Sequence, residues 1–273
     1  MKQTKALIIM ALLLLCGAVT ASESGITAPR KETKKRDNVE QTRKYEVAPF
    51  DRIDCATIAN IYLVQGNETS VEARLHTGSL ELLDVSVENG CLKITNVSKA
   101  RYDNHYSVDP KGKLYFGDLD GEHSRQQSVD FYITTPSVSQ ITLDGASRLT
   151  AKSLNVPKLS IKVSAISTVT LQNLVCNDTR MELAGAYSCD INATGNCLTL
   201  NGTGVGKTRL KFKGGKLNIS NSGAGSVKAE VDCQELQAEN AGCGKITLKG
   251  TADHTSIESS GVSTIDTKQL NQY

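Results

Sequence analysis

The sequence has no tryptophan, and its phenylalanines and tyrosines make up only 4% of 273 residues. Proline occurs five times, and the four histidines are His76, His105, His123 and His254. The shortage of rings argues against a core of large aromatic side chains. The histidines do not pair at a metal-ligand spacing, so a histidine-based metal or nucleophile centre is not expected.

The sequence also lacks an excess of charge of one sign. It holds 31 basic and 29 acidic residues, and without Lys2 and Lys5 the basic count falls to 29. A neutral chain gives no reason to expect a nucleic acid or an anionic membrane as its partner.

Residues 1–21 have the pattern of a secretory signal peptide. Two lysines precede an apolar run over 6–15, and the small residues 19–21 resemble a cleavage site. This run is too short to cross a bilayer. Cys16 raises the alternative of a lipid anchor, which Leu15 disfavours because that processing needs a small residue before the cysteine. We therefore expect export to the periplasm, the outer membrane surface or the medium.

Residues 22–44 are predicted to be a flexible charged linker, since they hold almost no apolar residue between 30 and 44. From residue 45 the chain alternates apolar and polar residues in short runs, which predicts strands. We divide this domain, 45–273, into irregular coils over 45–135 and regular coils over 136–273.

The regular part repeats a small-residue phrase with a period of 19 to 20 residues. Its anchors, spaced by 20, 20 and then 19 residues, are Gly145, Ala165, Gly185, Gly204, Gly223, Gly242 and Gly261. Apolar residues recur four before, four after and six after most anchors, with polar residues between the last two. Each repeat is thus predicted to be a strand, a bend and a second strand. Glycine suits the bend because it tolerates positive φ and close backbone approach.

Stacking these repeats about 4.8 Å apart makes an all-β, single-stranded parallel β-helix with coils of about 19–20 residues. A leucine-rich repeat has a similar period, but its Leu-x-x-Leu-x-Leu phrase is absent. The Gly-Gly-x-Gly-x-Asp phrase of a calcium-binding nonapeptide roll is absent as well.

An irregular segment, 101–127, interrupts the first part and is predicted to be a long loop or hairpin. It contains a large share of the rings: Tyr102, Tyr106, Tyr115 and Phe116. Aromatic side chains on a loop are typical of recognition sites. The alternative is that they cap the end or flank of the stack.

One pair of acids could carry chemistry. Glu239 and Glu258 lie three residues before consecutive anchors, so stacking would place their backbones on adjacent coils. The alternative, which we favour, is two glutamates exposed to solvent. Residues 201–208 resemble a phosphate loop, but Asn201 replaces its first glycine and a strand follows in place of a helix. No catalytic residue, cofactor or metal is therefore predicted.

Cysteines remain after removal of the signal peptide in an odd number: Cys55, Cys91, Cys176, Cys189, Cys197, Cys233 and Cys243. Cys176 and Cys197 lie one coil plus one or two residues apart, so a disulfide between neighbouring coils is conceivable in an oxidising compartment.

The order of parts resembles the head GIN domain family. The resemblance rests on Tyr45 to Ile53, Leu92-Lys93-Ile94, the strand end at 131–136 and the Ser-Gly-Ala-Gly-Ser-Val repeats. It implies a right-handed β-helix, a surface or periplasmic location and an adhesin-like role toward a glycan or protein, without catalytic residues. The alternatives are a polysaccharide-acting enzyme on the same scaffold and a purely structural envelope protein. The sequence does not indicate an oligomeric state.

Overall fold

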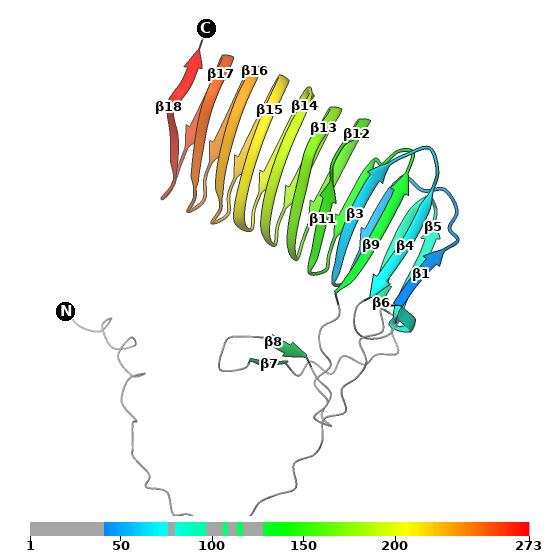
Figure 1. The fold of residues 1–273 in the computed structure, drawn as a ribbon. Coiled ribbons are helices and arrows are strands. Elements are labelled where there is room, and N and C mark those ends of the chain that lie inside the picture. The colour runs from blue at the N-terminus through cyan, green and yellow to red at the C-terminus, as the bar shows by residue number, and fades with distance from the viewer. Residues whose placement is uncertain (1–40, 76–79, 97–105, 109–113, 117–127, 273) are drawn as a thin grey trace, which may run out of the picture. The chain divides into compact units, whose positions relative to one another are not determined.

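A computed structural model describes residues 41–75, 80–96, 106–108, 114–116 and 128–272 (Figure 1). The predicted signal peptide and residues 22–40 of the predicted linker lie outside these ranges. The described chain is almost all β-strand, and its helical element is a single 3-10 turn, η1 (Leu80–Leu82). The all-β prediction is therefore confirmed.

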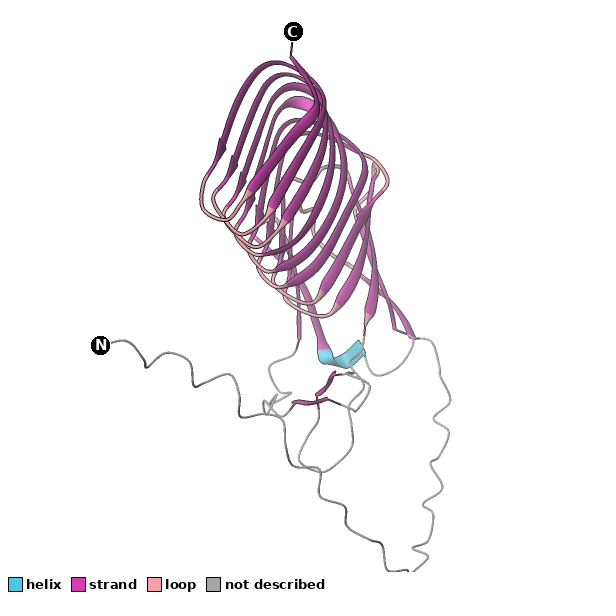
Figure 2. Ribbon diagram, turned by 90° about the vertical axis from the view of Figure 1, so that its left-hand side faces the viewer, coloured by secondary structure: helices cyan, strands magenta, loops and turns pink. Residues whose placement is uncertain are grey.

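The regular part is a stack of parallel strands (Figure 1). Its strands are β10 (Gln140–Leu143), β11 (Ser147–Ala151), β12 (Leu154–Val163), β13 (Ile166–Leu183), β14 (Ala186–Gly202), β15 (Val205–Asn221), β16 (Ser226–Asn240), β17 (Lys245–Ser259) and β18 (Thr264–Gln272). From β13 to β17 each strand runs along nearly a whole coil, and it pairs in parallel with the strands of the preceding and the following coil. Figure 2 shows the bends between them lined up along one side. This is the predicted β-helix.

The register places equivalent residues of successive repeats opposite each other. The residues four before the anchors form one column: Ile141, Ile161, Met181, Leu200, Ile219, Ala238 and Ile257. All of them are buried except Ile257, in the last complete coil. The columns four and six residues after the anchors are also buried from β11 to β17. The apolar positions that recur with the repeat period therefore form the hydrophobic core.

The change of period from 20 to 19 has a single structural location. Between β13 and β14 the register slips after Leu171, which pairs with Ile191, whereas Leu174 already pairs with Ala193. Gln172 and Asn173 thus occupy the corner that Asn192 alone occupies one coil later. We call residues 140–183 the early coils and residues 186–259 the late coils.

The first part of the chain enters the stack out of order. Its strands are β1 (Gln41–Tyr45), β2 (Arg52–Cys55), β3 (Ala59–Gln65), β4 (Ser70–Leu75), β5 (Leu83–Glu88), β6 (Cys91–Asn96) and β9 (Val129–Thr135). β2 pairs in parallel with β6 on one side and β10 on the other, and β3 lies in the same way between β9 and β11. The first strands therefore form the second layer of the stack.

Antiparallel strands finish this end, which the repeat pattern did not predict. β4 pairs with β9 and with β1, and β5 pairs with β6. β1 begins at Gln41, so residues 41–44, predicted to be linker, belong to a strand. Their side chains are exposed while their backbone pairs with β4, which is why a purely polar sequence can form this strand.

The glycines at the bends are needed for space. A Cβ at Gly223 would lie 2.0 Å from the carbonyl oxygen of Gly204, and one at Gly242 would lie 2.0 Å from that of Gly223. Positive φ occurs at only one of the described anchors, Gly261, at 74°. The expectation of positive φ was therefore wrong for the other anchors, whereas close backbone approach was right.

The interior of the bend is filled differently in the two sets of coils. In the early coils Ser147 and Ser167 are buried there, with their hydroxyl oxygens 3.2 Å apart. In the late coils two buried asparagines stack instead, and Asn221 Nδ2 donates to Asn240 Oδ1 at 2.8 Å. Asn240 Nδ2 donates to the carbonyl oxygens of Gly244 and Thr264.

Tyr187 lies at the junction between the two fillings. The residue at the equivalent position is Ser167 one coil earlier and Gly206 one coil later. The ring covers Gly206, where a Cβ would lie 2.6 Å from a ring carbon. The hydroxyl reaches Gly202 and Gly225, so glycines in the late coils make room for this ring.

Candidate interaction surfaces

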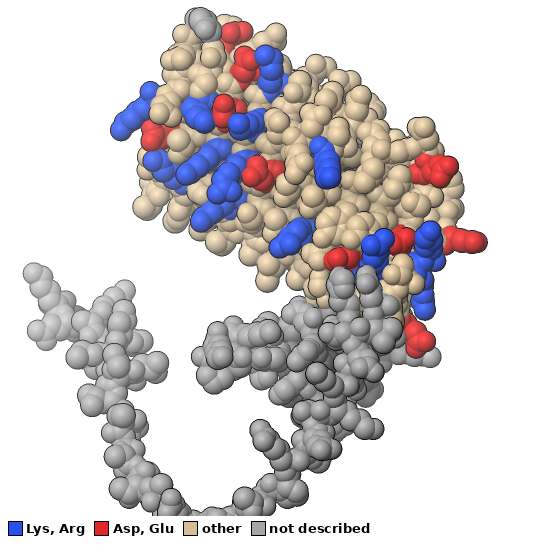
Figure 3. Space-filling model, in the orientation of Figure 1, with Lys and Arg blue, Asp and Glu red and all other residues tan. Residues whose placement is uncertain are grey.

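Basic residues gather on the exposed strand face of the late coils. Figure 3 shows lysine and arginine side chains concentrated over the coils from β14 to β18. Their positions lie three, five and seven residues after the anchors, where side chains alternate with the buried columns. We call this set the basic face: Lys207, Arg209, Lys211, Lys228, Lys245 and Lys249, all exposed.

Acids neutralise one half of the basic face. Glu230 lies between Lys211 and Lys249, with its Oε2 3.6 Å from Lys211 Nζ and 3.0 Å from Lys249 Nζ. The hydrogen bond from Lys249, together with the two charges, lowers the pKa of Glu230. Lys245 pairs with Asp266 at 3.1 Å, which likewise lowers the pKa of that carboxyl. Lys211, Glu230 and Lys249 thus alternate in sign on successive coils and form a solvent-exposed ladder of ion pairs.

The other half of the basic face carries three cations that are not in ion pairs with described residues, although Asp190 lies opposite one of them, Arg209, on the preceding coil. Among the described residues, Lys207, Arg209 and Lys228 form no ion pair within 4 Å. Arg209 and Lys228 are direct neighbours on adjacent coils. Like charges at such positions repel and lower stability. Stacking on Asp190 therefore covers one side of Arg209 but does not explain the bases at Lys207 and Lys228.

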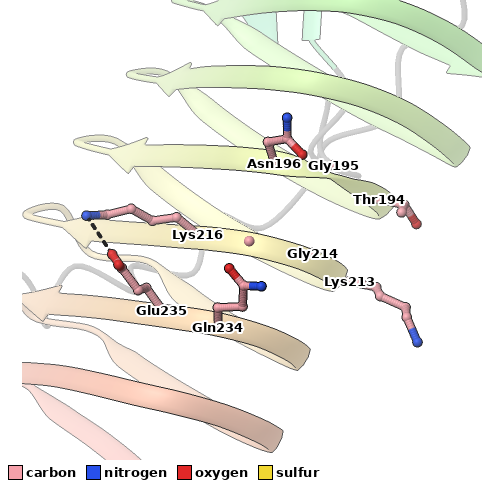
Figure 4. Close-up of a pocket in the computed structure, with 9 residues that line it drawn as sticks. Thr194, Gly195, Asn196, Lys213, Gly214, Lys216, Gln234 and Glu235 are labelled. Carbon is pink, nitrogen blue, oxygen red and sulfur yellow. Dashed lines mark ion pairs between the residues drawn. The ribbon is translucent and has the colours of Figure 1, made fainter.

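A shallow hollow of about 570 Å³ lies at the next corner of the same coils (Figure 4). It is lined by Thr194, Gly195, Asn196, Lys213, Gly214, Gly215, Lys216, Gln234 and Glu235. Lys216 pairs with Glu235 at 3.0 Å across adjacent coils, as Figure 4 shows. The amides of Asn196 and Gln234 are exposed to solvent.

Glycines create this hollow. A Cβ at Gly195 would lie 1.7 Å from the carbonyl oxygen of Cys176, and one at Gly214 would lie 1.7 Å from that of Gly195. The backbones therefore pack in direct contact, and no side chain fills the surface above them. The corner offers amides, ammonium groups and a carboxylate, which can form hydrogen bonds with polar ligands.

The acid pair considered from sequence lies as the repeat predicted. Glu239 and Glu258 are direct neighbours on β16 and β17, and both are exposed. Sequence reasoning missed another carboxyl, Asp54 on β2, whose pKa is raised by burial and then by the charge of Asp144. Asp54 lies on neither the basic face nor the hollow.

The aromatic segment contains a short antiparallel hairpin, as expected. β7 (Tyr106–Val108) pairs with β8 (Leu114–Phe116), so Tyr106 lies opposite Phe116 and Ser107 opposite Tyr115. Tyr102 lies outside the described residues. The proposed recognition role of these rings stays a prediction.

The seven cysteines after the predicted signal peptide are free thiols in the structure. The register places Cys197 opposite Asp178, while Cys176 is buried and its carbonyl lies against Gly195. The two are thus offset along the strand, and the disulfide Cys176–Cys197 stays a prediction. Burial raises the pKa of Cys189 to about 12 and that of Cys55 and Cys233 to about 11, which makes these thiols poor nucleophiles.

Groups of three or more side chains that could hold a metal ion are not found in the described part of the chain. Across the same residues, no helix has the length and apolar character to cross a bilayer.

One family model matches nearly all of the described chain. It carries the description "Putative auto-transporter adhesin, head GIN domain" and matches residues 49–212 and 198–272. No curated protein matches the chain.

Solved structures share the fold. A putative adhesin from Bacteroides fragilis is 21% identical with a TM-score of 0.67, and the alignment covers 84% of this chain and 96% of that one. A putative adhesin from Parabacteroides distasonis is 15% identical, with a TM-score of 0.56 over 84% and 98% of the two chains. A putative lipid binding protein from the same species is 18% identical, with a TM-score of 0.53 over 84% and 97%.

Proposed function

Because the chain belongs to the head GIN domain family of auto-transporter adhesins, we propose that it is an exported, non-enzymatic adhesin-like module. Its role is to hold a rigid surface toward a glycan or protein partner outside the cytoplasm. The signal-peptide pattern over residues 1–21 supports export to the periplasm or the cell surface.

The observation that carries this proposal is the basic face beside the polar hollow. Strands fixed by continuous parallel pairing hold these side chains, so a partner meets a preorganised surface at little cost in ordering. The surface is broad and polar, and its ions are exposed. Such a surface suits contact with an extended partner better than it suits acid–base catalysis, which needs partly buried groups with shifted pKa values.

The exposed glutamates support the non-enzymatic assignment. Glu239 and Glu258 stand on a solvated face, away from the hollow. Replacing both by Gln should leave binding unchanged and should remove no polysaccharide cleavage. Loss of a cleaving activity in the double variant would favour the enzyme alternative.

Location and adhesion are tested on cells that express the full chain. We expect the protein in the envelope fraction, accessible to added protease, and we expect cells without it to adhere less to mucin-coated or epithelial surfaces. A chain found only in the cytoplasm, or an unchanged adhesion, would contradict the proposal.

The aromatic hairpin offers a second contact region. Replacing 101–127 by a short Gly-Ser linker should reduce adhesion and leave the melting temperature unchanged, because loops on rigid scaffolds carry recognition residues. A lower melting temperature or aggregation would instead assign the segment to capping.

A further inference from the structure

We propose that the basic face binds a linear acidic polysaccharide, whose repeated carboxylate or sulfate groups lie along the cations of β15 and β16. This inference rests on the proposed adhesin function and names the chemistry of its partner. Its starting point is the half of the basic face whose cations form no ion pair among the described residues, Lys207, Arg209 and Lys228.

The charge of this surface is local. Overall the sequence is nearly neutral, with 31 basic and 29 acidic residues. Along β15, however, every second residue after the bend is exposed and basic, at Lys207, Arg209, Lys211 and Lys213, and Lys216 follows at the hollow. Lys213 and Lys216 have acid partners on β16, at 2.8 Å and 3.0 Å. The cations near the bend do not.

The contrast between neighbouring columns argues for a ligand. Seven residues after the anchors, Lys211, Glu230 and Lys249 alternate in sign and stabilise the stack. Five residues after them, Asp190 lies opposite Arg209, but Arg209 and Lys228 then stack as like charges. Repulsion of this kind lowers the stability of the free protein, and a bound anion would relieve it.

The dimensions of the face suit an extended polymer. Neighbouring coils are about 4.8 Å apart, and alternate residues of one strand are about 6.6 Å apart. The cations therefore form a flat grid without walls, which cannot enclose a small anion but can contact repeated charges along a chain. Arg209 can bind a carboxylate or sulfate through two parallel hydrogen bonds.

The groups between the cations favour a sugar polymer over the other polyanions. Beside the acid Asp190, the same columns hold Ser188, Asn192 and Ser226, which can form hydrogen bonds with hydroxyl groups. The exposed large hydrophobic and aromatic residues lie outside these columns. The face therefore lacks the rings that stack on nucleic acid bases and the apolar side chains that enter a lipid surface.

The experiment measures binding of the purified chain to polygalacturonate and heparin, with neutral dextran, duplex DNA and phosphatidylglycerol vesicles as comparisons. We expect binding to the two acidic polysaccharides that weakens with salt, since bound cations release counterions. Lys207→Ser/Arg209→Ser/Lys228→Ser should weaken it about ten-fold or more and make the salt dependence shallower by about two to three in log–log slope.

A matched control removes the same charge elsewhere. Arg43, Lys44 and Lys158 are exposed and lie outside the columns of the basic face, so their triple change to Ser should alter affinity less than about three-fold. Glu230→Gln is a gain-of-function variant, because it frees Lys211 and Lys249, and it should strengthen binding several-fold. Neither triple variant should melt below the parent, and the basic-face variant should melt at the same temperature or slightly higher because it loses the repulsion between Arg209 and Lys228.

Three results would overturn the inference: no binding of either acidic polysaccharide, equal weakening in the two triple variants, or binding of DNA or vesicles in preference to the polysaccharides. The adhesion assay on cells is independent of this measurement. Cells that adhere through a chain that binds no acidic polysaccharide would refute this inference and leave the proposed function standing, whereas a failure of adhesion would refute the function itself.

Discussion

The early and late coils have the same backbone path but differ in three ways. The early coils contain 20 residues, close their bends with buried serines and have few basic side chains on the strand face. The late coils contain 19 residues, close their bends with asparagine and glycine, and carry the basic face. Backbone pairing is the same in both, so it does not determine how a bend is filled or what a coil presents to solvent.

Tyr187 explains how two fillings coexist in one stack. Its ring needs the space that Gly206 and Gly202 leave free, so glycine on the following coil depends on this tyrosine. Beyond it, Asn221 donates to Asn240 and Asn240 donates to two backbone carbonyls inside the bend, while Asn221 Oδ1 and the Tyr187 hydroxyl have no hydrogen-bond partner among the described residues. The lesson is that repeats of this kind are adapted to their neighbours and are not interchangeable, as nearest-neighbour coupling in solenoids implies.

The largest expected effect is a difference in reactivity between an exposed thiol and a buried thiol. Cys243 is exposed at a late-coil bend, where the early coils have Ala146 and Ile166, while Cys189 is buried with a pKa raised to about 12. A maleimide added to the native protein at neutral pH should label Cys243 about a thousand-fold faster than Cys189. Peptide mapping by mass spectrometry measures both rates. Similar rates would mean that the column containing Cys189 opens readily.

The same peptide map, made without reduction on protein from an oxidising compartment, tests the disulfide. A peptide linking Cys176 to Cys197 would confirm the pairing predicted from their spacing. Free thiols at both positions would agree with the offset between these residues and would reject it.

Gly242→Val should destabilise the late coils by about 3 kcal/mol or more, because the new Cβ would overlap the carbonyl oxygen of Gly223. Urea denaturation followed by circular dichroism gives the free energy of unfolding. The early-coil control is Ala165→Gly, at an anchor that already has a Cβ, and it should cost less than about 1 kcal/mol. A valine variant as stable as the parent would show that the late bends can move apart.

Asn240→Ala should lower the free energy of unfolding by about 2–3 kcal/mol, because it removes hydrogen bonds to the buried Asn221 and to the backbone carbonyls of Gly244 and Thr264, which lie on three coils. Ser167→Ala, a change of a buried polar residue in an early bend, removes only the hydroxyl contacts to Ser147 and to the Gly145 carbonyl and should cost about 1 kcal/mol. Equal losses measured by the same denaturation would contradict the idea that the asparagines organise the late bends.

The smallest effect expected is a pH dependence that the late coils have through Glu230. Its pKa is lowered in the folded protein, so its stabilising contribution is present above the ordinary glutamate pKa of about 4.3 and is lost as the pH falls through the lower folded value. The difference in melting temperature between pH 7 and pH 3 should therefore be slightly smaller in Glu230→Gln than in the parent. An unchanged difference would mean that solvent screens these ion pairs completely.

Sequence reasoning reached further into the regular coils than into the rest. A fixed period with alternating apolar residues determines the parallel stack, the buried columns headed by Ile141 and Leu149, and the ladder of Lys211, Glu230 and Lys249. These features follow from local alternation and from stacking equivalent residues, so the order of residues is enough to derive them.

The interaction surfaces were harder to predict because they join residues from several coils. Overall neutrality concealed the basic face, since charge counted along a chain says nothing about which acids reach which bases. The hollow depends on contact between the backbones at Gly195 and Gly214, and only the packed coils reveal it.

By itself, the sequence determined the solenoid, its period, its core and its likeness to the head GIN domain family, because all of these repeat along the chain. Tertiary structure alone decided that β2 and β3 lie between later strands, that antiparallel strands finish the first end, and that Tyr187 separates two kinds of bend. The physical reason is that these contacts join residues far apart in the chain. Local periodicity is compatible with several arrangements of such residues, and the packing and hydrogen bonding of the whole stack favour one of them.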